Sequence, residues 1–414
     1  MGRINQSLIL AEILHNGPLS RADISRNTGL SKPSVSRSVG ILLQENLLRK
    51  LPSRDHGKVG RKPELLSINH QACLFACVDI GGSNVTITIG NLSGEFVGNT
   101  ESLKNNHHWD GIVETIHAGV KQLLSSAGFP VERLKGIGVA VQGVVDLGGF
   151  TVSSAPNIGD PDGYPLGEAL RSYFSCPVLI ENDVNAEALG EHWKGGARYS
   201  NMVHISLGTV VGGGLILNGQ LFRGAHYYAG EIGWLIPGKD YLFRNLDKYG
   251  SLESLISGPA MTRTVESLIA TGNFASDALA ESSDLSPKNI FKYYKVGTSD
   301  LANHVVKEWL SNLGIAISNI CSLLDPEAVI LGGGLTHSGD FFLNELREIV
   351  NWGTQNPPEL HIGRAKNASL YGMLKLCLDN YLGTLYAAEM GRQTACRNGG
   401  VVRNQILYRS YEDE

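Results

Sequence analysis

The feature that most constrains this chain is a glycine-rich stretch at residues 204–234. An apolar run at residues 202–207 leads into a cluster of glycines at residues 208–214, and the chain then turns at Asn218-Gly219, which indicates a β-hairpin. Glycines after a strand let backbone N–H groups approach an anion, because no Cβ stands in the way. Since a lone acid, Glu231, follows, we predict a phosphate-type loop beside a second ligand site. The alternative is a glycine-rich hairpin in a large α/β protein.

Charge is distributed unevenly along the chain. Residues 1–70 contain eleven lysine and arginine residues against five acidic ones, whereas the rest of the chain contains 24 against 35. A basic head on an acidic body is typical of a nucleic-acid-binding module attached to a separate domain. The alternative is a small domain with an ordinary solvated basic face.

Length, cysteines and hydropathy limit the class of protein. A chain of 414 residues predicts two or three domains. No apolar run has membrane-spanning length and no signal-peptide pattern opens the chain, so we expect no membrane partner. The six cysteines are scattered without paired ligand spacing, which favours a cytoplasmic protein with reduced thiols.

The basic head has the pattern of a helix-turn-helix. Apolar residues recur at helical spacing over residues 4–14, Ser20 and Asp23 have capping-box spacing, Gly29 supplies a turn, and Ser31 caps a third helix. Helix, tight turn and helix is the arrangement of this class of DNA-binding module. The third helix begins with short or basic side chains suited to phosphates and base edges, namely Ser31, Lys32, Ser34, Ser36 and Arg37.

A wing is expected after these helices. Its two strands are predicted at residues 47–51 and 64–68, with an extended basic tract between them. Arg61 and Lys62 lie in that tract and suit a phosphate-lined minor groove. The alternatives are a flexible basic loop and, for the whole head, a three-helix module that contacts protein. The basic excess favours DNA.

Two motifs in the body resemble the ROK family of repressors, open reading frames and kinases. They are Gly208-Thr209-Val210-Val211-Gly212-Gly213-Gly214 and Gly230-Glu231-Ile232-Gly233-Trp234, and the head is similar to the winged helix-turn-helix of ROK repressors. Members of the family normally have glycine where this chain has Val210 and histidine where it has Trp234. The resemblance implies an α/β protein with an N-terminal winged helix-turn-helix followed by a two-lobed actin-like ATPase (ribonuclease-H-like) ROK domain.

The resemblance also implies a division of the chain. We expect a DNA-binding domain at residues 1–70 and a first ROK lobe at residues 71–188, completed by a helix near residues 376–390. A second lobe at residues 189–375 would carry the sugar-site and oligomerisation elements. The sequence assigns no role to the tail at residues 391–414.

A nucleotide site is implied at three strand ends. Asp79, with Gly81 and Gly82, follows the first strand of the body, where sugar kinases of this fold hold metal and phosphate. Gly208, Thr209 and Val210 match the second phosphate loop, and Gly333 follows a final strand on the adenosine side. A β-branched residue is unfavourable at positive φ and adds bulk where a phosphate approaches. We therefore expect the loop at Val210 to be degenerate.

The resemblance places a sugar beside this loop. The expected sugar-binding residues are Asn157, Asn182, Asp183, Glu231, Trp234 and Glu253. In kinases of the family the aspartate matching Asp183 is the general base, a role that requires a carboxylate within hydrogen-bond reach of the attacking hydroxyl. The alternative for Asn182 and Asp183 is ordinary helix capping. Trp234 either stacks on the sugar or fills the space left by a metal.

The zinc site of the family is not matched. ROK proteins commonly bind zinc through the motif histidine and three cysteines, and the matching positions here hold Trp234, Arg244, Leu246 and Ser251. None of these is an ordinary zinc ligand. We therefore predict no bound metal and no other cofactor.

Three functions compete. We expect a sugar-responsive transcriptional regulator, a repressor without enzymatic activity, whose cleft closes on a sugar or sugar derivative and shifts paired DNA-binding heads. One alternative is an active ATP-dependent sugar kinase with a DNA-binding head. The other is a docking surface for a sugar-transport component, against which the unmatched zinc site argues. The expected partners are operator DNA with two palindromic half-sites, the sugar effector and the chain itself, as a homodimer or tetramer.

Overall fold

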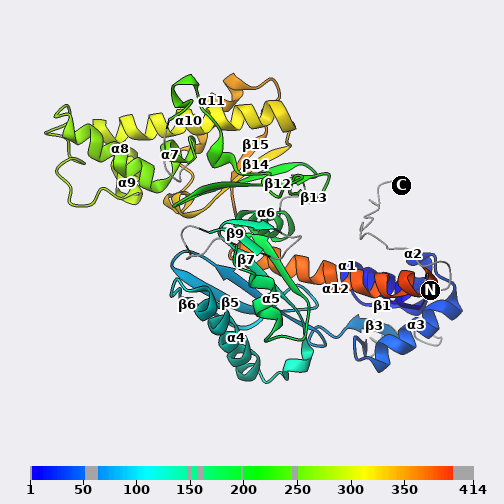
Figure 1. Ribbon diagram of the computed structural model, residues 1–414. Coiled ribbons are helices and arrows are strands. Elements are labelled where there is room, and N and C mark those ends of the chain that lie inside the picture. Colours follow the sequence, from blue (N-terminus) through cyan, green and yellow to red (C-terminus); the bar gives the residue numbers. More distant parts are fainter. Residues whose placement is uncertain are drawn as a thin grey trace.

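A computed structural model describes residues 2–51, 64–146, 151–155, 158, 163–196, 199–244 and 250–394 (Figure 1). Within those residues the chain forms a small N-terminal head and two larger lobes, each built on a five-stranded sheet. None of the helices in the described ranges is both long enough and apolar enough to cross a membrane.

The head is the expected winged helix-turn-helix. The Ser20 hydroxyl accepts a hydrogen bond from the Asp23 N–H, and the Asp23 carboxylate accepts one from the Ser20 N–H, while Gly29 ends the second helix with a φ of 68°. Val35, Val39 and Leu42 bury one face of the third helix. The elements are α1 (Gly2–Asn16), β1 (Leu19–Ser20), α2 (Arg21–Thr28), α3 (Lys32–Gln44), β2 (Leu48–Leu51) and β3 (Leu65–Ile68), and their strands pair in the order β1-β3-β2.

The first lobe is organised on a sheet with the strand order β10-β7-β4-β5-β6. β4 and β7 are parallel to each other and almost entirely buried, so their side chains are apolar apart from one charged residue in each strand, Asp79 and Lys135. The strands are β4 (Leu74–Ile80), β5 (Asn84–Asn91), β6 (Phe96–Lys104), β7 (Leu134–Val141) and β10 (Val178–Asn182). The other elements are α4 (Trp109–Ser126), η1 (Val131–Arg133), β8 (Val144–Asp146), β9 (Thr151–Ser154) and α5 (Leu166–Arg171).

The second lobe repeats that topology, with the strand order β13-β12-β11-β14-β15. In each sheet the central strand pairs antiparallel with its neighbour on one side and parallel with its neighbour on the other, and each outer strand continues the pairing type of its side. The strands are β11 (Met202–Leu207), β12 (Val211–Leu217), β13 (Gln220–Phe222), β14 (Ala328–Gly332) and β15 (Glu359–Ile362). The helices are η2 (Ile232–Trp234), η3 (Lys239–Tyr241), α7 (Glu253–Ile256), α8 (Gly258–Ala270), α9 (Pro287–Val296), α10 (Asp300–Leu324), η4 (Gly334–Ser338) and α11 (Leu343–Gly353).

Two helices cross between the lobes, α6 (Asp183–Lys194) and α12 (Ala368–Thr394). Their backbones touch: a Cβ on Gly190 would lie 1.9 Å from the Ala368 oxygen, and one on Gly372 would lie 1.9 Å from the Ala186 oxygen. The helix expected near residues 376–390 is therefore part of a longer element that begins at Ala368. The predicted boundary at residue 375 falls inside α12.

The head packs on the first lobe through α12 (Figure 1). Ile9 and Val39 of the head share one buried cluster with Phe75 of β4 and with Leu374 and Leu378 of α12. The Ser7 hydroxyl donates to the Leu382 carbonyl over 3.2 Å, between α1 and α12. The head is thus part of a core that continues into the body, and not only a module on a separate domain.

Candidate functional site

Each lobe presents a three-residue hairpin turn after its central strand. In the first lobe the Gly81 N–H donates to the Asn84 oxygen over 2.9 Å, and in the second the Gly208 N–H donates to the Val210 oxygen over 3.1 Å. Val210 is not one of the non-glycine residues with positive φ. The expectation that Val210 strains this loop is therefore wrong, because the turn uses no left-handed residue at that position. Val210 therefore differs from the glycine of the family only in the bulk of its side chain.

Only part of the glycine cluster forms a loop, so the loop is shorter than expected. Gly212, Gly213 and Gly214 belong to β12, so the loop spans only residues 208–210. A Cβ on Gly214 would lie 2.5 Å from the Ala188 Cβ, and one on Gly212 would lie 2.9 Å from the Val184 Cγ2. The close packing of β12 on α6 therefore accounts for Gly212 and Gly214 without a phosphate. The sequence alone does not separate the two causes.

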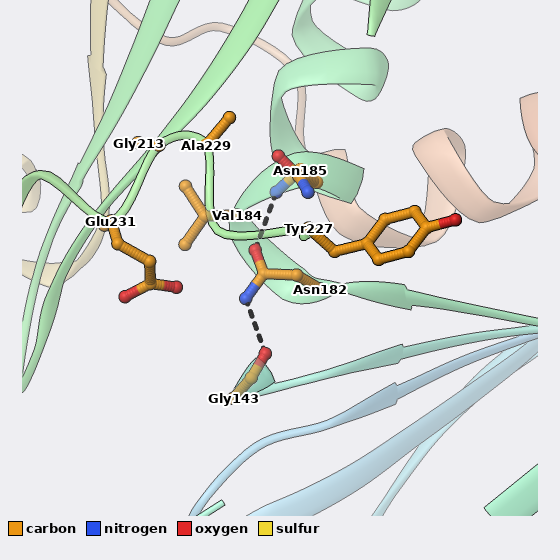
Figure 2. A pocket seen from close by; sticks show the side chains of 10 residues that line it. Gly143, Asn182, Val184, Asn185, Gly213, Tyr227, Ala229 and Glu231 are labelled. Atoms are coloured by element: carbon orange, nitrogen blue, oxygen red, sulfur yellow. Dashed lines mark hydrogen bonds between the residues drawn. The ribbon is translucent and has the colours of Figure 1, made fainter. Parts of the chain in front are cut away.

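A small cavity lies where the two lobes meet (Figure 2). Its volume is about 20 Å³, room for roughly one water molecule, and Asn182 and Glu231 line it together with Gly143 and Tyr227. The Asn182 and Glu231 side chains lie on either side of Val184 and both extend toward Gly143 (Figure 2). The structure thus brings together two of the expected sugar-binding residues, one from each lobe.

Asn182 is committed to structural hydrogen bonds. Its Oδ1 accepts from the Asn185 N–H over 3.0 Å and so caps α6, and its Nδ2 donates to the Gly143 oxygen over 2.9 Å. One amide hydrogen and one acceptor lone pair of Asn182 remain for a ligand. Capping and ligand binding, which the sequence offers as alternatives, are therefore compatible in this geometry.

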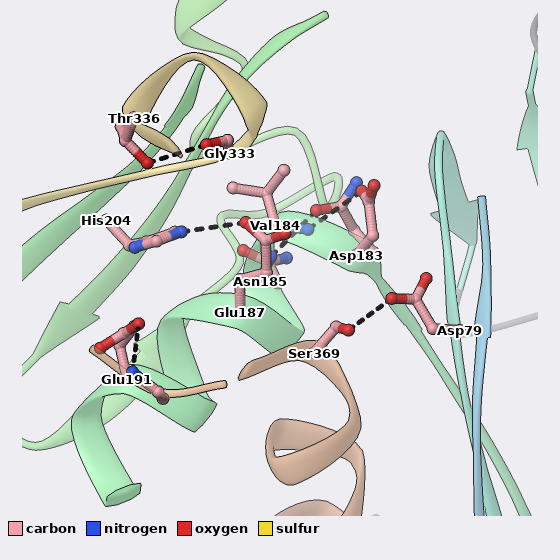
Figure 3. A network of polar contacts seen from close by, with 12 residues as sticks. Asp79, Asp183, Val184, Asn185, Glu187, Glu191, His204, Gly333, Thr336 and Ser369 are labelled. Atoms are coloured by element: carbon pink, nitrogen blue, oxygen red, sulfur yellow. Dashed lines mark hydrogen bonds and ion pairs between the residues drawn. The ribbon is translucent and has the colours of Figure 1, made fainter. Parts of the chain in front are cut away.

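Carboxylates from several elements gather at the start of α6 (Figure 3). Asp79 of β4 accepts a short hydrogen bond from the Ser369 hydroxyl at the start of α12. Glu187 accepts from the buried His204 ring of β11 over 3.0 Å. Sequence reasoning missed Glu187, His204 and Ser369, since no motif links positions so far apart in the chain.

The local environment raises the pKa of both aspartates. Burial raises the pKa of Asp79 to about 6, and the Ser369 hydrogen bond opposes that change. Burial, followed by the negative charges of Glu187 and Asp79, raises the pKa of Asp183 well above its usual value. Both carboxyl groups therefore take up a proton more readily than a free aspartate does.

Glu231 and Glu253 form the acidic side of the second lobe. Burial raises the pKa of each, and the charge of Glu253 adds to the effect at Glu231. Glu253 accepts a hydrogen bond from the Val211 N–H over 2.9 Å. Glu253 therefore fixes the end of the 208–210 turn, although it is not among the residues that line the cavity.

Trp234 does not line the cavity, and its side chain is 60% exposed. Of the other zinc-equivalent positions, Arg244 stacks over the Tyr241 ring at 4.7 Å, Ser251 accepts from the Ser254 hydroxyl through its backbone oxygen, and Leu246 lies outside the described residues. Indole, guanidinium and hydroxyl groups do not form the donor set that zinc requires. The residues present do not fit the metal of the family.

A larger hollow of about 660 Å³ lies beside the 208–210 turn. Gly208 and Thr209 line it, opposite the first residues of α8 and α9 and beside Gly334. Gly333 adopts a φ of 82°, and a Cβ there would lie 2.5 Å from the Leu207 oxygen, so glycine is required at this position. A volume of this size is in the range of ordinary small-molecule sites.

The expected DNA-binding residues of the third helix point to solvent. Ser31, Lys32, Ser36 and Arg37 are exposed, and Ser34 is half-buried, with its hydroxyl 2.9 Å from that of Ser31. Ser31 is the N-cap of α3, and its side chain accepts from the Ser34 N–H. Ser31 therefore has a structural role in addition to the expected DNA contact. Arg61, Lys62 and the expected sugar ligand Asn157 lie outside the described residues.

Comparisons with known proteins cover both parts of the chain. The sequence pattern of the ROK family matches residues 75–379, and that of the MarR family matches residues 2–58. A xylose repressor of Caldicellulosiruptor bescii is 29% identical over 354 residues, which cover 84% of this chain and 88% of the relative. A glucokinase of Halalkalibacterium halodurans is 32% identical over 280 residues, which cover 66% of this chain and 84% of the relative.

The fold is matched by a solved structure over nearly its whole length. A ROK family transcriptional regulator, described as a homologue of the E. coli MLC protein, has a TM-score of 0.79 to this chain at 23% identity. The match covers 93% of this chain and 98% of the other. At that level of identity the similarity shows a shared fold.

Proposed function

Because this chain belongs to the ROK family and begins with a winged helix-turn-helix, we propose that it is a sugar-responsive transcriptional repressor. The observation that carries the proposal is the shared core of the head and α12, since α12 also crosses α6, where the expected sugar residues lie. A ligand that changes the lobe junction thereby acts on the element that supports the DNA-binding head.

DNA binding is assigned to residues 1–70, with Arg37 reading a base edge and Lys32 and the serines of α3 contacting phosphates. A single head covers one half-site, so the proposed operator is a palindrome with two half-sites, bound by a homodimer or tetramer of this chain. Replacing Arg37 with alanine should weaken operator binding by about 1–3 kcal/mol. Arg37→Ala protein that binds the operator like wild type in a mobility-shift titration would exclude α3 as the reading helix.

Sugar binding is assigned to Asn157, Asn182, Asp183, Glu231, Trp234 and Glu253. Carboxylates and amides suit the hydroxyl groups of a sugar, because charge-assisted hydrogen bonds are strong and a buried acceptor without a partner is unfavourable. Similarity to xylose repressors makes D-xylose the first effector to test, with D-glucose second.

The absence of phosphoryl transfer is part of the proposal. Val210 places a branched side chain directly after Gly208 and Thr209, the two residues of the turn that line the 660 Å³ hollow, and a kinase needs a close approach of phosphate to the backbone of such a turn. A specific observation supports a second candidate, a sugar kinase. The hollow is open, and the raised pKa of Asp183 is compatible with a general base, which works best near the operating pH.

One pair of measurements separates the candidates. Under the proposal, wild-type protein releases or gains operator DNA when D-xylose or D-glucose is added and shows no sugar-dependent ATP turnover. Asp183→Asn protein keeps its operator affinity without sugar and loses the sugar response. ATP turnover on either sugar that disappears in Asp183→Asn protein would make this chain a kinase.

A further inference from the structure

The loop from Arg223 to Glu231, here the 223–231 loop, forms the second-lobe wall of the small cavity. The loop is closed on itself and is tied to the second sheet near its end. Its Ala229 N–H donates to the Arg223 oxygen over 3.1 Å, and the Gly213 N–H of β12 donates to the Gly230 oxygen over 2.7 Å. A Cβ on Gly230 would lie 2.0 Å from the Gly213 oxygen, so the loop runs backbone to backbone along β12.

Arg223 joins this loop to the other lobe. Its Nε lies 2.7 Å from Oε2 of Glu181, which is in β10 of the first sheet. The Glu181 side chain is only 4% exposed and that of Arg223 is 27% exposed. Charged hydrogen bonds of this length are strong, and removing one partner leaves a buried charge without compensation.

Glu181 also links Arg223 to the first turn of α6, where Asn182 and Asn185 line the small cavity. Besides Arg223, its carboxylate accepts from the Asn182 N–H over 3.1 Å and from the Asn185 Nδ2 over 3.0 Å. A single carboxylate therefore holds the second-lobe loop, the end of β10 and the first turn of α6 together. The loop ends at Glu231. The Arg223–Glu181 pair therefore fixes the position of Glu231 in the second lobe relative to Asn182 and Asn185 in the first.

Asn185 supplies an independent indication of a ligand. Because its Nδ2 is bound to Glu181, its Oδ1 is left as an acceptor, and no group in the described part of the chain donates to it. Asn185 is 4% exposed and lines the small cavity. A buried acceptor in this position requires a donor, and the cavity has room for about one water or one ligand hydroxyl.

We propose that Arg223 is a positioning residue of the sugar site: paired with Glu181, it holds Glu231 and Asn185 in place before the sugar arrives. The inference rests on the proposed function. Without the pair, binding must also order the 223–231 loop, and such ordering reduces affinity even when every direct contact is kept. Arg223 itself does not need to touch the sugar.

A double-mutant cycle tests this role. Dissociation constants for D-xylose and D-glucose are measured by calorimetry on the full chain as wild type, Arg223→Met, Glu181→Gln and the double variant. Each single variant should weaken sugar binding by at least about tenfold. The double variant should be no weaker than the singles, because the pair is already broken. Arg223→Lys, which keeps the charge, should bind more tightly than Arg223→Met.

The control is Lys194→Met, which removes the ion pair between Lys194 of α6 and Glu95. Neither residue lines the small cavity. Its sugar affinity should stay within about twofold of wild type. Melting temperatures without ligand are recorded for every variant. If Arg223→Met lowers the melting temperature but binds sugar like wild type, the pair is only structural and the inference is overturned. The same holds if the effects of the two single variants multiply.

Two further outcomes are informative. If Arg223→Met does not fold, Glu181→Gln carries the test, because its carboxamide still accepts from Asn182 and Asn185. Wild-type protein that binds neither sugar contradicts the proposed function, and the ligand role of Arg223 with it. Wild-type protein that binds sugar with unchanged affinity in Glu181→Gln contradicts the role of Arg223 alone.

Discussion

The two lobes have the same strand order and the same three-residue turn after the central strand, yet their surroundings differ. The first sheet shares its core with the head and α12. The second sheet packs its glycine strand on α6, and twelve of the fourteen large apolar side chains that are exposed in the described residues lie between Phe222 and Trp352. One topology therefore has two different surroundings: the first lobe supports the head, and the second supplies one wall of the small cavity and most of the exposed apolar surface of the described residues.

The largest expected effect concerns the shared core. Leu374 of α12 is fully buried in the cluster that includes head residues, whereas Leu346 is fully buried in the separate core of the second lobe. Leu374→Ala and Leu346→Ala should each lower the free energy of unfolding by about 2–5 kcal/mol. Hydrogen exchange should distinguish them, because only Leu374→Ala should reduce the protection of amides in α1. Equal loss of protection in α1 would contradict the asymmetry between the lobes.

A somewhat smaller effect is expected in β12. A valine at Gly214 would place its Cβ about 2.5 Å from the Ala188 Cβ, so Gly214→Val should lower the free energy of unfolding by about 2–3 kcal/mol. Thr209→Val is the control, since Thr209 is exposed in the neighbouring turn and should change stability by about 0.5 kcal/mol or less. Denaturant titration of both variants provides the comparison. A neutral Gly214→Val would mean that β12 and α6 are less tightly packed than the structure indicates.

Replacing Asp79, a buried acid of the first lobe, should stabilise the protein. Burial raises the pKa of Asp79 from its ordinary value of 3.8 to about 6 in the folded chain, so between these values the folded chain holds a proton that the unfolded chain has lost. Rising pH therefore favours unfolding through this window. Asp79→Asn removes the dependence and should raise stability at pH 7 by on the order of 1–3 kcal/mol, with little difference from wild type below about pH 4. Melting curves from pH 3 to 8 test the sign, and a destabilised variant at pH 7 would contradict it.

The smallest expected effect is at the zinc-equivalent positions of the second lobe. Trp234, Arg244 and Ser251 do not supply zinc ligands, so elemental analysis should find no stoichiometric zinc. Treatment with a chelator should leave the melting temperature unchanged, because no binding energy to a metal would be lost. One tightly held zinc per chain would show that other residues replace the ligands of the family.

The sequence was sufficient for features that depend on neighbours in the chain. Ser20 with Asp23, Gly29 and Ser31 defined the helices of the head, and Asn218-Gly219 marked the turn before β13, because capping and turn formation involve residues within a few positions of one another. The two motifs around Val210 and Glu231 were sufficient to identify the family. Membership of that family was then sufficient to predict the two-lobed fold.

The tertiary structure decided what depends on distant residues. Gly212 and Gly214 proved to be packing contacts, because what a Cβ would meet there is α6. The Glu181–Arg223 pair joins positions 42 apart, and Ser7 and Leu382 meet although they are 375 positions apart. Local pattern carries no record of such contacts, since they form only when the two lobes and the head come together. The docking of the head on α12 and the Glu181–Arg223 connection between the lobes were therefore visible only in the folded chain.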